Sequence, residues 1–260
     1  MKDLEKQIDS KQNLVVSSRK NYRAGRIIID EHAHKKHQII IPRSGSIQVI
    51  ASDHGTYMAT SGQGFFIKAH QNHHAIYSGV ISVDNLYLSP QVCDLLPDTF
   101  VFEITSLLSA LAERLCKKLH WDKLTKELSS LCYLLCEEIK NHHQPASFLP
   151  RPNNTQLLAI TTSIENNVQY MSSIKDIAKK LNMSERHFRR FFQAECKMSF
   201  SAWLTRLKIM LAKEMLAGTL PISEIALELG FEEFGSFSRF FKKNIGVTPA
   251  QWRNNYLREV

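Results

Sequence analysis

Two stretches near the C-terminus share one plan: residues 172–193, SSIKDIAKKLNMSERHFRRFFQ, and residues 220–243, LPISEIALELGFEEFGSFSRFFKK. Each begins with the pattern I-x-x-I-A-x-x-L, which has the spacing of a short helix with one buried face. A tight turn follows, and then a second segment with Phe on one side and Arg or Lys on the other. A turn between two short helices, the second of them basic, is typical of a helix-turn-helix that places its second helix in the DNA major groove. The duplication therefore predicts two DNA-binding units on one chain.

The second segment of each unit supplies the predicted DNA contacts. Ser184 is placed as a helix N-cap, and Phe188, Phe191 and Phe192 have the spacing of one buried face. The arginine fork can engage guanine O6 and N7 together, so arginines are predicted to contact bases and lysines to contact phosphates. The candidate DNA-binding residues are Arg186, Arg189, Arg190, Ser236, Arg239, Lys242 and Lys243. Residues 200–218 are predicted to form one helix that keeps the two units about one DNA turn, roughly 34 Å, apart.

These segments resemble the AraC/XylS family of bacterial transcription regulators. The similarity is carried by IKDIAKKLNMSERHFRRFF, by WLTRLKIMLAKEML and by ISEIALELGFEEFGSFSRFFKKNIGVTPAQWR, together about a hundred residues. The resemblance implies that Arg186, Arg189 and Arg190 enter one major groove, and that Gly235, Ser236 and Arg239 enter the next. The chain departs from the family pattern at Phe234 and Gly235, where the family commonly has polar residues, so the second unit is expected to differ in its sequence preference.

Composition agrees with a DNA-binding protein of two modest domains. The chain has 260 residues and a formal net charge of +8, and residues 155–260 carry 15 Lys and Arg against 10 Asp and Glu. The apolar runs are far shorter than the roughly 18 residues of a membrane span, and the polar N-terminus lacks the features of a secretory signal. A bacterial cytoplasmic, nucleoid-associated protein with reduced cysteines is therefore expected. Cys132 and Cys136 share a helix face, either as buried interface residues or as a metal or redox pair.

The expected fold is α+β and multidomain, with residues 1–20 loosely ordered. Residues 21–140 are predicted to form a small β-barrel or sandwich followed by two helices at about 103–140, because short strand-like runs separated by turns give way to helical periodicity. The resemblance to cupins described in the next paragraph implies that this part is a cupin-like β-barrel. Residues 141–154, NHHQPASFLPRPNN, are predicted to be a linker, and residues 155–260 an all-α DNA-binding domain. The apolar stripes of the two predicted helices are Leu107, Leu108, Leu111 and Leu115, and Leu124, Leu128, Leu131 and Leu135.

The barrel region contains seven histidines between residues 31 and 75. The arrangement G-x6-H-x-H-x3-Q-x6-G, from Gly25 to Gly45, resembles the first motif of cupins, in which a Glu usually stands where this chain has a Gln. That resemblance implies a divalent metal held by His32, His34, Gln38 and His73. A neutral Gln is a poorer ligand than a carboxylate. The alternative is that the histidines line a pocket or the surface without a metal.

The sequence therefore predicts a transcription regulator that is not an enzyme. It would bind double-stranded operator DNA, act as activator or repressor through RNA polymerase, respond to a small-molecule or metal effector in the barrel, and pair as a homodimer through the two helices. The alternative is a cupin-type metal-dependent enzyme joined to a DNA-binding domain, which would need a metal with open coordination positions. DNA repair by cysteine methyl transfer is disfavoured because the zinc-binding cysteine cluster expected for it is not seen in the sequence.

Overall fold

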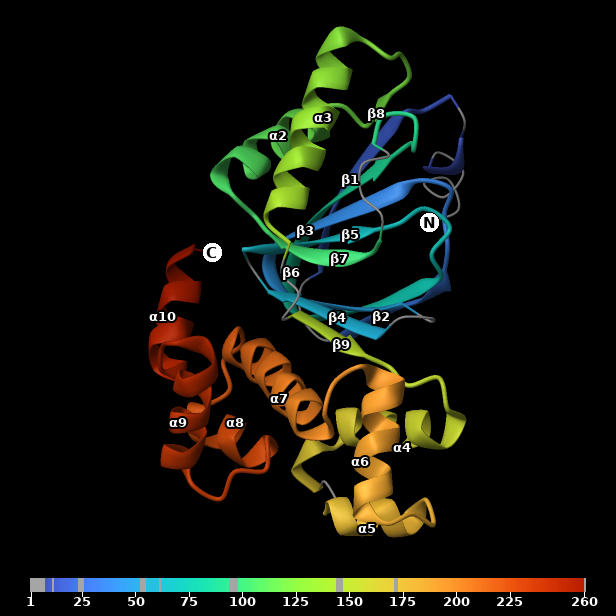
Figure 1. The fold of residues 1–260 in the computed structure, drawn as a ribbon. Helices are drawn as coiled ribbons and strands as arrows, with labels where there is room; N and C mark the ends of the chain where they lie inside the picture. Colours follow the sequence, from blue (N-terminus) through green and yellow to red (C-terminus); the bar gives the residue numbers. More distant parts are fainter. Residues whose placement is uncertain are drawn as a thin grey trace. The chain divides into compact units, whose positions relative to one another are not determined.

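The computed structural model describes residues 8–10, 12–22, 26–51, 55–60, 62–93, 98–143, 147–170 and 173–259 (Figure 1). The chain divides into two compact units, one built mainly from residues up to Phe148 and the other from Leu149–Glu259. No helix among the described residues combines the length and apolar character that a membrane crossing requires. The predicted α+β fold, with a cupin-like first unit and a helical second unit, is confirmed.

The first unit is a curved, mostly antiparallel sheet with the form of a half-barrel (Figure 1). Its strands are β1 (Val15–Tyr22), β2 (Arg26–His32), β3 (His37–Ala51), β4 (Gly55–Thr60), β5 (Gln63–Ile67), β6 (His73–Leu88), β7 (Phe100–Glu103), β8 (His120–Trp121) and β9 (Phe148–Pro150). The order is β7-β5-β3-β6-β1-β8, with β2 beside β6 and β4 beside β3 and β9. Runs that the sequence presents as separate strands are joined here into the long β3 and β6, which pair from His37↔Leu88 to Ala51↔His73.

Two apolar layers explain why β3 is hydrophobic on both faces. Ile40 belongs to a core cluster on one side of the sheet, together with Phe65 and Tyr77. Ile39 and Ile41 point to the opposite side and join the cluster that includes the two helices. Successive side chains of a strand alternate between faces, so a strand covered on both sides needs an unbroken apolar run.

The two helices that follow the strands pack against this second layer. They are α2 (Ser106–Cys116) and α3 (Lys126–Asn141), and each begins at a threonine whose side chain accepts a hydrogen bond from a backbone N–H. Leu108, Leu111 and Leu115 are buried as the periodicity predicts, whereas Leu107 and Leu124 are exposed. Leu107 lies at the edge of the apolar face of α2, and Leu124 precedes the N-cap Thr125 of α3, so the predicted stripe of the second helix starts too early.

Three expectations about the first unit need correction. The ordered part starts before residue 21, because β1 begins at Val15 and pairs with β6 along its whole length. The predicted linker at 141–154 contains β9, in which Leu149 is fully buried. The cysteines are not all reduced: Cys93 and Cys136, 43 residues apart in sequence, form a disulfide. Cys132 and Cys136 are both buried on α3, as one of the two interpretations of that pair predicts.

From Thr155 on, the described residues of the second unit form helices and the short turns that connect them. Its elements are α4 (Thr155–Asn166), a short 3-10 turn at Val168–Tyr170, α5 (Ile174–Lys180), α6 (Glu185–Cys196), α7 (Phe200–Leu216), α8 (Ile222–Glu228), α9 (Phe234–Ile245) and α10 (Pro249–Glu259). Its first core is aromatic: Phe188, Phe192, Phe200 and Trp203 are at most 2% exposed, and the Trp203 indole N–H donates to the Pro150 carbonyl at 3.0 Å. Such packing orients α6 and α7 relative to one another.

Candidate nucleic-acid interface and effector site

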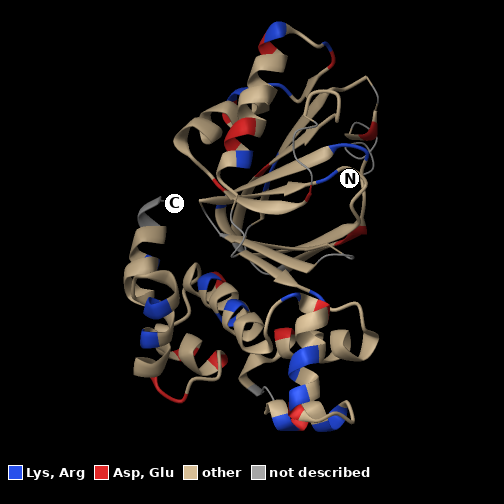
Figure 2. Cartoon of the chain, in the orientation of Figure 1, with Lys and Arg blue, Asp and Glu red and all other residues tan. Residues whose placement is uncertain are grey.

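The first candidate recognition helix is α6. Ser184 caps it, its hydroxyl accepting the His187 backbone N–H at 3.2 Å. Phe188 and Phe192 are fully buried, while Phe191 is only half-buried, so the inner face is narrower than predicted. The predicted DNA-binding residues on this helix, Arg186, Arg189 and Arg190, are all exposed. Figure 2 shows the basic residues along α6 and the neighbouring α5.

Helix α5 adds basic residues that sequence reasoning did not assign to DNA. Lys175, Lys179 and Lys180 are exposed on it, and the first two line a surface hollow whose other wall includes Ser184 and Glu185. The pattern I-x-x-I-A contains a usable signal for them, because it buries Ile177 and Ala178 and leaves the lysines on the opposite side. Lysines beside a recognition helix are suited to DNA phosphates.

The second candidate recognition helix is α9, where Phe237 and Phe241 are fully buried. The predicted DNA-binding residues Arg239, Lys242 and Lys243 are exposed, and Ser236 is partly exposed. The Arg239 guanidinium donates to the Ser236 hydroxyl at 3.1 Å, so two predicted contact residues lie together on one face. Phe234 is 51% exposed at the start of the same helix, an unusual place for a large apolar side chain.

The acidic residues around α9 make the second helix-turn-helix unit less uniformly basic than the first helix-turn-helix unit. Glu224, Glu228, Glu232 and Glu233 are exposed on α8 and on the turn before α9, where Figure 2 shows acidic residues. Phosphate attraction is therefore weaker at this end.

Helix α7 connects the two helix-turn-helix units as one continuous helix, as predicted. The closing segment of the chain secures its far end: Arg253 donates from Nε to the Leu216 carbonyl at 3.0 Å and from Nη2 to the Leu220 carbonyl at 2.7 Å. The last carbonyls of a helix have no partner within the helix, so this arginine satisfies groups that would otherwise need water. The last residue of the motif G-V-T-P-A-Q-W-R thus holds the end of α7 and the turn that leads into the second helix-turn-helix unit.

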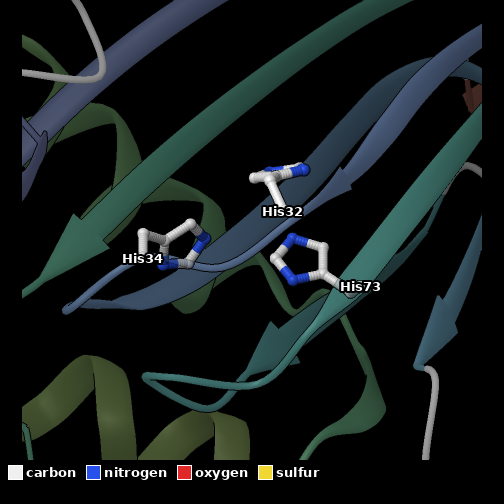
Figure 3. A group of neighbouring side chains, drawn as sticks. All are labelled: His32, His34 and His73. Atoms are coloured by element: carbon white, nitrogen blue, oxygen red, sulfur yellow. The ribbon is translucent and has the colours of Figure 1, made fainter.

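A second candidate site lies in the half-barrel, where His32, His34 and His73 converge (Figure 3). Their ligand atoms lie within 4.8 Å of one another, and within the described residues no other group of three or more His, Cys, Asp or Glu has this property. The strand register explains the approach, because His32 of β2 pairs with His73 of β6, and His34 follows in the turn before β3. The structure brings His73, the predicted third histidine, into the cluster.

The environment of these rings is buried and polar. Burial lowers the pKa of His73 to about 3 and also lowers the pKa of His34, so both rings are neutral at pH 7. Gln38 lies against His34, with its Oε1 2.9 Å from the His34 Nε2. The Gln38 amide N–H groups donate to Asn85 Oδ1 at 2.9 Å and to the Tyr87 hydroxyl at 3.3 Å. The structure therefore places the Gln38 side chain against the Nε2 of the His34 ring.

Other histidines of the region have different surroundings. The His37 ring points away from the cluster, as strand alternation predicts, accepts the Ala69 backbone N–H at 3.1 Å and lies against Phe66. His70 is exposed and has a positive φ of 66°. Gly25, where the cupin-like motif starts, lies outside the described residues.

Both compact units of the chain match family models built from known proteins. Residues 20–147 match the family model of the AraC-like ligand binding domain, and residues 177–255 match a helix-turn-helix domain model, so together the two models span most of the chain. The HTH-type transcriptional activator RhaR of Yersinia pestis bv. Antiqua (strain Angola) is 26% identical over 251 residues, covering 88% of this chain and 86% of that protein. RhaR of Salmonella dublin is 30% identical over 136 residues, covering 51% of this chain and 48% of that protein.

Among solved structures, ToxT of Vibrio cholerae aligns over 92% of this chain and 97% of its own, with 13% sequence identity and a TM-score of 0.39. The two domain models and the activators matched along the chain agree with the fold and with the basic recognition helices. The chain belongs to the AraC family of transcription regulators.

Proposed function

We propose that this AraC-type regulator binds an operator by placing α6 and α9 in successive major grooves of one DNA duplex, under control of an effector bound in the half-barrel. The observation that carries the proposal is the same division of faces on both helices. Phe188 and Phe237 are fully buried, while Arg190 and Arg239 are exposed. A helix with an aromatic inner face and a basic outer face is anchored to its domain and offers its polar groups to the groove.

The contacts divide by chemistry. Arg186, Arg189, Arg190 and Arg239 are proposed to contact base edges, and Ser236 supports Arg239 through their hydrogen bond. Lysine ammonium groups are point charges without bidentate geometry, so they are proposed to contact phosphates. These are Lys242 and Lys243 on α9, and Lys175, Lys179 and Lys180 on α5.

Helices α2 and α3 are proposed to pair two copies of the chain. Leu107 on α2 and Tyr133 and Leu134 on α3 are 48%, 57% and 47% exposed, so both helices offer large apolar side chains for contact with a second copy. A homodimer would double the number of major-groove contacts. The protein is further proposed to act in the bacterial cytoplasm through RNA polymerase. The matched relatives are transcriptional activators, which favours this function over a cupin-type enzyme.

The test is hydroxyl-radical footprinting on fragments selected from random DNA by the purified protein. Each bound chain should protect two backbone patches about 10 base pairs apart on one side of the duplex. Arg239→Ala should weaken the patch made by α9 and keep the other. The control is Lys123→Ala, an exposed basic residue of the first unit, which should leave both patches unchanged. A single patch per chain in the wild-type protein would contradict the proposal.

A further inference from the structure

We propose that His32, His34 and His73 bind one divalent first-row transition-metal ion, with Zn²⁺ the best fit, and that this ion is the effector or completes its site. The inference rests on the proposed function in one respect, the role of the half-barrel as the sensing unit. The binding site itself is argued from the three side chains alone (Figure 3).

The first argument is orientation. Each ring has its Nδ1 against a backbone carbonyl two residues away: His32 to Asp30 at 2.8 Å, His34 to Lys36 at 2.6 Å and His73 to Gln71 at 2.9 Å. A carbonyl can only accept, so a neutral His32 or His73 ring with this contact has its proton at Nδ1 and its lone pair at Nε2. The His34 ring has an oxygen at each nitrogen, the Lys36 carbonyl at Nδ1 and Gln38 Oε1 at Nε2, so its Nε2 becomes available when the Gln38 contact is broken. A carbonyl behind the non-coordinating nitrogen is the usual outer partner of a metal-bound histidine.

The second argument is convergence. The three residues come from the end of β2, the turn after it and the start of β6, yet the ring centroids of His32 and His73 are 4.4 Å apart and those of His34 and His73 are 5.2 Å apart. His34 and His73 are 7% and 1% exposed, and the more exposed His32 leaves access from solvent.

The third argument is selectivity. Imidazole nitrogens suit Zn²⁺, Co²⁺, Ni²⁺ and Fe²⁺, whereas Mg²⁺ and Ca²⁺ require oxygen ligands. Three protein ligands also leave a coordination position open on a tetrahedral ion, and an anionic or hydroxyl-bearing small molecule would complete it. The site therefore accommodates a metal alone or a metal with an organic ligand.

Gln38 has a different role from the one that the cupin resemblance implies. Its amide lies against the His34 Nε2, the atom that the ion needs. An ion bound there displaces the contact, while Gln38 keeps Asn85 and Tyr87 as partners. Tyr87 packs with Val16 of β1 and with Ile8, and the Lys36 ammonium donates to the carbonyls of Ile8 and Ser10.

The experiment titrates the purified full-length protein with Co²⁺ and Zn²⁺ after treatment with a chelator. Co²⁺ bound by three imidazoles should give visible d–d bands without the near-ultraviolet charge-transfer band of a thiolate ligand, at one ion per chain. His73→Ala and His32→Ala should each weaken binding by about 100-fold or more, since even outer-shell partners of metal ligands contribute 10–100-fold. His32 is the less buried of the two and provides a variant that leaves the interior packed.

Matched variants separate the roles. His120→Ala, an exposed histidine outside the cluster, should bind the ion as the wild type does. Gln38→Ala should bind it at least as tightly, because the contact that competes for His34 is gone, whereas a direct ligand would weaken binding when removed. No bound ion, or undiminished binding by both His32→Ala and His73→Ala, would overturn the site.

A second measurement tests the effector role. Operator affinity, followed by fluorescence anisotropy with and without Zn²⁺, should change by about 5- to 150-fold in the wild type and stay constant in His73→Ala. An ion that binds at the three histidines without altering operator affinity would refute the effector role. Failure of the protein to bind selected DNA under any condition would instead refute the proposed function, since the cobalt spectrum does not depend on DNA.

Discussion

Replacing Arg190 by alanine should reduce sequence preference without affecting the fold. Arg190 is exposed on α6, opposite the buried Phe188 and Phe192, so its truncation removes no core contact. The free energy of unfolding should therefore change by no more than about 0.5 kcal/mol. A bidentate arginine–guanine pair discriminates against other bases by roughly 1–3 kcal/mol, which corresponds to about 5- to 150-fold in affinity. That loss should appear on the operator and be absent on random DNA.

Lys242→Ala provides the comparison because Lys242 is also exposed and basic but is proposed to contact a phosphate. Its removal should weaken binding to operator and random DNA alike. It should also lower the slope of log affinity against log salt concentration by about 0.9, the contribution of one neutralised phosphate. For Arg190→Ala the slope should fall by less than that.

The assay is fluorescence anisotropy with the operator, a set of single-base variants and random DNA, each at several salt concentrations. Thermal unfolding of both variants controls for stability. One of the single-base operator variants changes the base pair that Arg190 contacts. The Arg190→Ala protein should bind that DNA and the original operator equally well. Equal losses on operator and random DNA for Arg190→Ala would refute the assignment of this residue to base contact.

Two further predictions concern other residues. Phe234, exposed at the start of α9, can contact a thymine methyl group. Replacing thymine by deoxyuridine in the α9 half of the operator should therefore weaken DNA binding by the wild type and leave binding by Phe234→Ala unchanged. Equal sensitivity of both proteins would exclude the contact. Burial alone raises the pKa of Asp84, but hydrogen bonds from Arg19 and Arg43 outweigh it and hold that pKa below its usual range. The ionised Asp84 therefore stabilises the folded state above about pH 4, and this contribution is lost as the pH falls through the folded-state pKa. The free-energy difference between wild type and Asp84→Asn in urea unfolding should therefore be larger at pH 7 than at pH 3, and a constant difference would argue against the ion pairs.

The two recognition helices could be predicted from the sequence because the information is local. Phe188 and Phe192 are four residues apart, as are Phe237 and Phe241, and a helix places such residues on one face whatever surrounds it. The basic residues between them must then face outward. The spacing predicts Phe191 on the buried face, but this residue is only half-buried, because the width of the buried face depends on what packs against the helix.

The histidine site could be predicted only in part. The cupin-like motif predicts His32, His34 and His73 as members of one site, and the structure brings these three together. The antiparallel register of β2 and β6 explains the approach, because it sets His73 opposite His32. The contact between the Gln38 amide and the His34 Nε2 depends on the turn before β3 and on Asn85, which holds Gln38 from β6. Asn85 is far from Gln38 along the chain, so the local sequence does not encode this contact.

Local periodicity in the sequence determined the helices, their inner and outer faces, and the tandem DNA-binding arrangement, since helical side-chain spacing repeats within a few residues. Tertiary structure alone decided the early start of β1, the strand inside the predicted linker, the Cys93–Cys136 disulfide and the place of Gln38 against His34. Each of these joins residues far apart along the chain. Their contacts form when whole strands and layers pack, and the energy of that packing is a property of the assembled sheet and its covering helices.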